Sequence, residues 1–197
     1  MKKTDIILAG VGGQGILSIA AIIGEAALDE GLHIKQAEVH GMSQRGGDVQ
    51  SHLRISSQPI HSDLIPRGKA DAIIALEPME ALRYLPSLSP KGWIVANSVT
   101  FENIPNYPKY EYLEKSLLER PHVILLDVHA VAKAENATRA ANMVLLGAAS
   151  AILPIDPSRL ERAIEKVFER KGGEVVAMNL RAFRTGRTAG ERGMGMQ

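Results

Sequence analysis

Glycines crowd the end of a short apolar segment near the N-terminus, in the stretch ILAGVGGQGI. Their spacing matches G-x-G-x-x-G, a pattern that joins a strand to a helix where dinucleotides bind. Such glycines permit a sharp turn and a close approach of a ligand to the backbone, and the helix N-terminus attracts an anion. We expect contact with a phosphate-bearing ligand or, alternatively, only a tight strand-to-helix turn. The residues concerned are Gly10, Gly12, Gly13, Gln14 and Gly15.

Nucleotide hydrolysis does not suit this loop. Ile16 and Leu17 stand where a phosphate-binding P-loop requires lysine and then serine or threonine. Glu38, by contrast, ends the next apolar segment, roughly where a dinucleotide enzyme holds a ribose hydroxyl with an acid. A stand-alone dinucleotide-dependent reductase is therefore one hypothesis, although no residue stands out as its catalytic acid or base.

A second polar loop follows, in the stretch EVHGMSQRGGDV. Its arginine stands between a glutamine and a pair of glycines, so the guanidinium group could pair with a carboxylate or a phosphate while another surface comes close. The alternative is a surface turn with a solvated arginine. The candidate residues for contact with substrate or partner are Glu38, His40, Ser43, Gln44, Arg45, Gly46 and Gly47.

The elements that must position these loops alternate between apolar segments and stretches with helical spacing. Strands are expected at 6–9, 32–39, 48–56, 70–76, 92–97 and 122–128, and helices at 16–30, 78–88, 110–120, 137–153, 156–172 and 174–184. This order predicts one Rossmann-like α/β domain with a twisted, mostly parallel sheet, flanking helices and a helical C-terminal part. We expect the domain to span residues 1–185 and residues 186–197 to form a flexible tail.

Polar residues also follow several predicted strands. Glu77, Asn97, Ser98 and the pair Asp127 and His129 could face the crevice at the carboxyl ends of the strands. Capping of the next helix is the plainer interpretation for Glu77 and Asp127. The six histidines form no H-x-x-H or H-x-x-x-H pair, so we expect no metal site.

Composition narrows the class of protein. The chain has 197 residues, a net charge of +1, 45% hydrophobic and 23% charged residues, which is typical of a soluble globular domain and favours neither nucleic acid nor membrane as a partner. It contains no cysteine, which excludes disulfides, all-cysteine iron–sulfur clusters and a cysteine nucleophile. Because no apolar run is long enough to span a bilayer and no signal peptide is recognisable, we expect a cytoplasmic location.

Taken together, GVGGQGI and the later RGG make the chain resemble the gamma-type subunits and domains of the 2-oxoacid:ferredoxin oxidoreductase family. The form HGMSQRGG is most similar to the indolepyruvate members, and the resemblance is densest over residues 5–55. It implies a complex that oxidatively decarboxylates an aryl pyruvate to arylacetyl-CoA, carbon dioxide and reduced ferredoxin. Family members acting on pyruvate, 2-oxoisovalerate or 2-oxoglutarate are the alternative.

The resemblance also implies a division of labour. Thiamine diphosphate, magnesium and the iron–sulfur clusters would belong to a large alpha subunit, ferredoxin would accept the electrons, and this chain would be inactive alone. The glycine loop would contact coenzyme A or the large subunit, and the second loop would face the partner or substrate. No catalytic step is assigned to a residue of this chain. A homodimer in isolation, or a purely structural adaptor, remains open.

Overall fold

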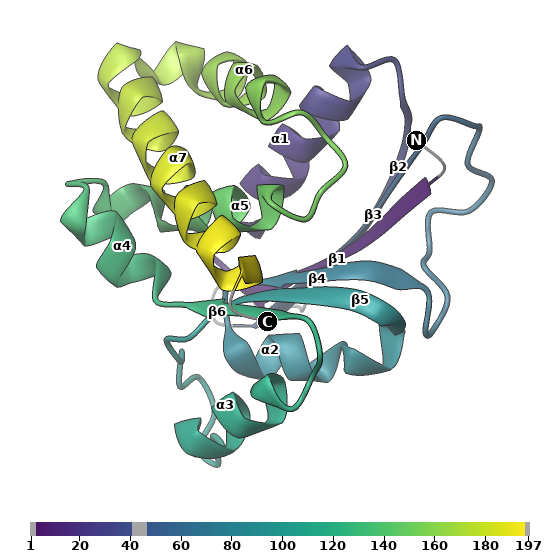
Figure 1. Cartoon of the computed structure of the whole chain (residues 1–197), viewed down its shortest axis with the longest axis vertical. Helices are drawn as coiled ribbons and strands as arrows, with labels where there is room; N and C mark the ends of the chain where they lie inside the picture. The colour runs from purple at the N-terminus through teal and green to yellow at the C-terminus, as the bar shows by residue number, and fades with distance from the viewer. Residues whose placement is uncertain (1–2, 41–46, 196–197) are drawn as a thin grey trace.

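A six-stranded sheet lies between two layers of helices in the computed structural model, which describes residues 3–40 and 47–195 (Figure 1). In sheet order the strands are β2 (His33–His40), β3 (Asp48–Ser56), β1 (Lys3–Val11), β4 (Ala70–Ala75), β5 (Leu88–Asn97) and β6 (Val123–Leu126). Strands β1, β4, β5 and β6 are parallel, and β3 is antiparallel to both of its neighbours. The predicted α/β class and mostly parallel sheet are confirmed.

The order of the first three strands differs from that of a simple strand–helix–strand unit. Helix α1 (Ile16–Asp29) leads from β1 to β2, but β3 lies between these two strands, and Ala9 and Val39 both pair with Gln50. The short connection from β2 to β3 favours antiparallel pairing, and Leu53 and Ile55 of β3 join the core beneath α1. Strand β2 is therefore displaced by two strand spacings, about 10 Å, from β1.

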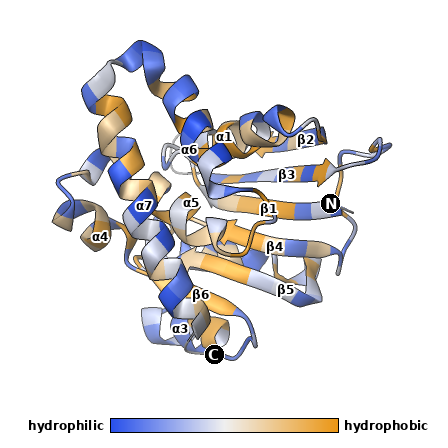
Figure 2. Cartoon of the chain, turned by 45° about the horizontal axis from the view of Figure 1, so that its top comes forward, coloured by the Kyte–Doolittle hydropathy of each residue, from blue (hydrophilic) through white to orange (hydrophobic). Residues whose placement is uncertain are grey.

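Four long helices cover one face of the sheet. In Figure 1, α1, α5 (Ala141–Ser150), α6 (Pro157–Phe168) and α7 (Gly173–Gly195) lie above the strands, with α4 (Val128–Ala134) at their edge. The other face carries α2 (Pro78–Arg83) and α3 (Tyr110–Leu118), and single 3₁₀ turns occupy Leu85–Ser87, Thr138–Ala140 and Glu169–Lys171. The hydrophobic core is accordingly split by the sheet, whose central strands are apolar along most of their length (Figure 2).

Helices α5 and α7 cross with their backbones in close contact. A Cβ atom on Gly186 would come within 2.0 Å of the Val144 carbonyl oxygen, and one on Gly190 within 2.4 Å of that of Ala148. On the facing helix, a Cβ atom on Gly147 would come within 2.0 Å of the Phe183 carbonyl oxygen. Glycine is therefore required at this crossing, because any side chain would push the helices apart.

This crossing corrects the prediction of a flexible tail. Residues 186–195 continue α7, because Gly186 and Gly190 hold the helix against α5. Glycine-rich sequence without apolar periodicity predicts a loose end, but here the glycines form the contact. Within the described residues, no helix has both the length and the apolar character needed to cross a bilayer.

The long loop from β3 to β4 is held by two side chains of β3. Arg54 donates to the fully buried carboxylate of Asp5 at 2.9 Å and to the carbonyl oxygens of Ser62 and Leu64, each at 2.9 Å. Nδ1 of His52 accepts a hydrogen bond from the Ile65 backbone N–H at 2.9 Å. These hydrogen bonds fix the loop to β3.

Gly186→Ala should destabilise the fold by about 2 kcal/mol or more, because the added methyl group overlaps the Val144 carbonyl. Gly195→Ala is the matched control, since a Cβ atom there meets nothing within 4 Å. Urea unfolding followed by circular dichroism measures both. Equal free energies of unfolding for the two variants would show that the crossing is not tightly packed.

Stability should fall as the pH is lowered through about 6.5, the ordinary pKa of histidine. Burial, with Arg54 nearby, lowers the pKa of His52 in the folded state, so the unfolded chain binds the proton more tightly and acid favours unfolding. The contribution is fully present above pH 6.5 and is lost as the pH falls toward the folded-state pKa. Urea unfolding at a series of pH values should show a shallower dependence of stability on pH for His52→Asn, with His61→Asn, in the loop from β3 to β4, as control.

Candidate functional site

The glycine loop forms a tight turn at the end of β1, fixed by one of its own side chains. Gly13 and Gly15 have φ angles of +99° and +91°, a left-handed conformation that side chains disfavour. Gln14 folds back so that its Oε1 accepts from the Val11 backbone N–H at 2.8 Å. A Cβ atom on Gly10 would meet this Oε1 at 2.9 Å. Part of the space that the glycines open is therefore filled by Gln14.

A second side chain fixes the far end of the loop. Asn142, in the first turn of α5, donates from Nδ2 to the Gly15 carbonyl oxygen at 3.3 Å. A Cβ atom on Gly15 would lie 2.6 Å from the same Nδ2. Turn geometry and close packing thus account for Gly10 and Gly15, whereas Gly13 is exposed and has open space around it.

A shallow hollow of about 250 Å³ remains over the N-terminus of α1. It is lined by Val11, Gly12, Gly13, Gly15, Ile16, Leu17 and Val49. The helix has no side-chain cap at Gly15, so its first turn can present backbone N–H groups to an anion. Among the described residues that line the hollow, none is basic, so a phosphate group here needs its countercharge from another segment or another chain.

The two sequence motifs are direct neighbours. The Gly12 backbone N–H donates to the Gly47 carbonyl oxygen at 2.9 Å, where the second loop enters β3. Ser43, Gln44, Arg45 and Gly46 lie outside the described residues, as does the side chain of His40.

Glu38 does not take the position of a ribose-binding acid. It is exposed on β2, two strands from the glycine loop, and its carboxylate accepts a hydrogen bond from Gln36. This placement disfavours the dinucleotide hypothesis.

Polar residues at the ends of the other strands serve the fold. Asn97 donates to the carbonyl oxygens of Leu76 at 3.2 Å and Val99 at 3.0 Å, and its Oδ1 accepts from the Val128 N–H at 3.2 Å. Asp127 caps α4 by accepting from Ala130 N–H at 2.8 Å, as the capping interpretation predicts. His129 is exposed on α4, a helix that the apolar periodicity did not indicate.

Glu77 is the centre of a buried hydrogen-bonded cluster that the sequence did not indicate. Its carboxylate is fully buried, caps α2 through Glu80 N–H at 2.8 Å, and accepts from the Phe101 N–H at 3.4 Å and from the Tyr107 hydroxyl. Burial, together with the bond to Glu77, raises the pKa of Tyr107. Nothing near Tyr107 in the sequence signals this contact, because the two residues are far apart in the chain.

A neighbouring carboxylate, Glu80, is also buried. Burial raises its pKa, although Arg83 donates to it at 2.8 Å. Next to it, burial and the charge of Asp48 raise the pKa of Tyr84 to about 12. Because their pKa values are raised, Tyr84 and Tyr107 keep their hydroxyl protons at neutral pH and can donate hydrogen bonds.

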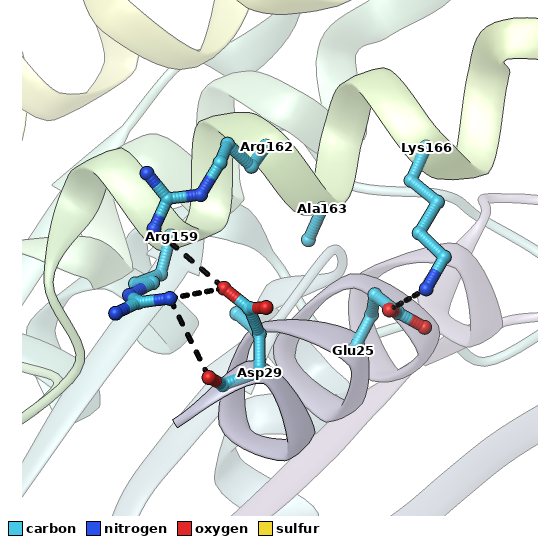
Figure 3. Close-up of a pocket in the computed structure, with 7 residues that line it drawn as sticks. Glu25, Asp29, Arg159, Arg162, Ala163 and Lys166 are labelled. Atoms are coloured by element: carbon cyan, nitrogen blue, oxygen red, sulfur yellow. Dashed lines mark hydrogen bonds and ion pairs between the residues drawn. The ribbon is translucent and has the colours of Figure 1, made fainter. Parts of the chain in front are cut away.

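A second hollow, between α1 and α6, differs from the one at the glycine loop because charged side chains line it. Figure 3 shows Arg159 and Lys166 of α6 paired with Asp29 and Glu25 of α1, and Arg162 lies 3.6 Å from Asp29. The hydrogen bond from Arg159 lowers the pKa of Asp29, and the bond to Glu25 raises the pKa of Lys166. Two carboxylates thus pair with three cations, and Arg159 and Arg162 share Asp29, so most of the positive charge of this hollow is already balanced within the chain.

Comparison with known proteins now identifies the family. The model of the pyruvate ferredoxin/flavodoxin oxidoreductase family matches residues 5–189. The chain belongs to this family. It is 35% identical over 189 residues to the indolepyruvate oxidoreductase subunit IorB of Methanothermobacter thermautotrophicus, covering 92% of this chain and 95% of that protein. The resemblance that GVGGQGI and RGG indicate is thereby confirmed.

Two solved structures share the fold. One is the gamma subunit of a keto/oxoacid ferredoxin oxidoreductase from Geobacter sulfurreducens, with a TM-score of 0.73 and 24% identity over 99% of this chain and 98% of that one. The other is the 2-oxoglutarate:ferredoxin oxidoreductase of Magnetococcus marinus, solved with 2-oxoglutarate, coenzyme A and succinyl-CoA bound. It aligns with a TM-score of 0.77 and 24% identity over 98% of this chain but only 32% of the longer one.

Tyr107→Phe should lower the free energy of unfolding by about 1–2 kcal/mol, because it removes a hydroxyl donor from the buried Glu77 carboxylate. Tyr110→Phe is the matched control: the hydroxyl of Tyr110 donates at 3.0 Å to Glu114, which is not buried. Urea unfolding of both variants separates the two effects. If Tyr107→Phe lowers the free energy of unfolding no more than Tyr110→Phe does, the hydroxyl of Tyr107 is not needed to stabilise the buried Glu77 carboxylate.

Proposed function

We propose that this chain is the small subunit of an indolepyruvate:ferredoxin oxidoreductase. The complex converts an aryl pyruvate, coenzyme A and oxidised ferredoxin to arylacetyl-CoA, carbon dioxide and reduced ferredoxin. Family membership, together with 35% identity to a subunit named for indolepyruvate over nearly the whole chain, carries the proposal. The likeness of HGMSQRGG to the indolepyruvate members favours this substrate over pyruvate, 2-oxoisovalerate or 2-oxoglutarate.

The chemistry of carbanion formation and electron transfer is assigned to a large partner subunit with thiamine diphosphate, magnesium and iron–sulfur clusters. The chain contains no cysteine with which to ligate a cluster. Among residues 3–40 and 47–195, no three His, Cys, Asp or Glu side chains are grouped to hold a metal ion. We also propose that the chain acts in the cytoplasm within such a complex, with ferredoxin as electron acceptor, and that any homodimer forms only without the partner.

We propose that this chain contributes a contact surface that includes its two glycine-bearing loops. The hollow at Gly12 and Gly13 suits a phosphate group of coenzyme A or an anionic group of the partner, because backbone N–H groups of α1 face it. Gly47, the first described residue after the loop that carries Arg45, bonds to Gly12, and Gly12 lines the hollow. We propose that Arg45 supplies the missing positive charge there.

Reconstitution tests the proposal, with indolepyruvate- and coenzyme A-dependent dye reduction as the measurement. The isolated chain should show no turnover, and the large subunit should become active when the chain is added. Arg45→Ala should lower turnover or assembly at least tenfold while leaving the melting temperature unchanged, since a loop arginine contributes little to the core.

Arg67→Ala is the control, at an exposed position of the loop that precedes β4. Wild-type turnover and assembly with Arg45→Ala would remove the second loop from the mechanism. Oxidation of a keto acid by the isolated chain would contradict the assignment of the chemistry to a partner.

A further inference from the structure

The loop between β5 and α3 exposes apolar side chains. Val99, Phe101 and Ile104 are 38%, 46% and 44% exposed, and they lie within six consecutive residues. Exposed apolar residues are common singly on protein surfaces, but a cluster in one short loop is typical of an interaction site. An aromatic anchor is the residue type that contributes most to such sites.

This loop is held in place by buried polar groups. Asn97 bonds to the carbonyl oxygen of Val99 at 3.0 Å, and Glu77 accepts from the Phe101 N–H and the Tyr107 hydroxyl. Glu77 is fully buried, so it has no access to solvent and its hydrogen bonds are made within the chain. A loop fixed in advance loses less conformational entropy when it binds, which strengthens association.

The same loop shares an edge of the sheet with the glycine loop. Ala75 pairs with Ala9 on one side and with Ala96 on the other, which places the ends of β1 and β5 about 10 Å apart. The Leu76 N–H, next to Glu77, donates to the Ala9 carbonyl oxygen at 3.0 Å. The apolar loop, the hollow at Gly12 and the entry to the second loop therefore lie along one edge.

We propose that Val99, Phe101 and Ile104 form part of the docking surface for the large subunit, with Glu77 as the residue that positions them. This inference rests on the proposed function. The Magnetococcus marinus structure supports the occupant, because the fold there makes up 32% of a longer chain, and a separate subunit must present the corresponding contact surface to another polypeptide.

Charge favours a different chain over a second copy as the occupant. Glu102, which lies between Phe101 and Ile104 in the sequence, is exposed on this loop. A symmetric dimer through the loop would bring the two Glu102 carboxylates toward each other, whereas a partner with basic residues would be attracted.

The test is the dissociation constant for the purified large subunit, measured by titration with labelled small subunit. The double variant Phe101→Ser with Ile104→Ser should bind at least tenfold more weakly and keep the melting temperature, because both side chains are exposed. Tyr107→Phe, which retains the apolar residues and loosens the loop, should bind several-fold more weakly. Turnover of the double variant should return toward wild type at saturating small subunit.

Leu118→Ser is the matched control, because Leu118 is 58% exposed at the opposite end of α3 and should leave the dissociation constant within twofold of wild type. Unchanged binding by the double variant, with wild-type association intact, overturns this inference and leaves the proposed function standing. An effect confined to self-association of the isolated chain also overturns it. Failure of the wild-type chain to associate with the large subunit would instead contradict the proposed function itself.

Discussion

The structure depends on hydrogen bonds at the carboxyl ends of the parallel strands. Backbone N–H and C=O groups there have no partner within the sheet, and buried ones must still be hydrogen-bonded. The chain meets the constraint with its own side chains: Gln14 at β1, Glu77 at β4, Asn97 at β5 and Asp127 at β6. In many open α/β sheets this edge holds a ligand with such residues. Here these four side chains are bonded to the fold, so they are held in place and are not free to bind a ligand. A fixed edge of this kind suits the proposed binding to a larger partner subunit.

The helical C-terminal part contributes to the same edge. Helix α5 carries Asn142, which donates a hydrogen bond to the Gly15 carbonyl oxygen. Five residues further along the same helix, Gly147 packs directly on the backbone of α7. The position of the glycine loop therefore depends on a helix that is itself fixed by backbone-to-backbone packing with α7. Residues at the two ends of the chain are coupled in this way, although nothing in the loop sequence shows it.

Local patterns predicted the elements well and their spatial neighbours less well. The apolar run before Gly10, the alternation from Asp48 to Ser56 and the cap at Asp127 each depend on a few adjacent residues, and the structure confirms all three. The insertion of β3 between β1 and β2 depends on pairing across the sheet, and the bond from Tyr107 to Glu77 depends on a contact between distant segments. The end of α7 was mispredicted because glycines usually weaken helices, whereas here they allow the helix to pack.

The glycine motif illustrates why a pattern of backbone freedom does not identify a ligand. The pattern G-x-G-x-x-G predicts that the chain turns tightly after a strand, and the left-handed φ angles of Gly13 and Gly15 show such a turn. A dinucleotide site also needs open space at the turn and an acid on the adjacent strand. Gln14 fills part of that space, and β3 separates Glu38 from the turn. The Gly12 N–H donates instead to the Gly47 carbonyl oxygen, so the turn lies directly beside the start of β3 and not beside the acid of β2.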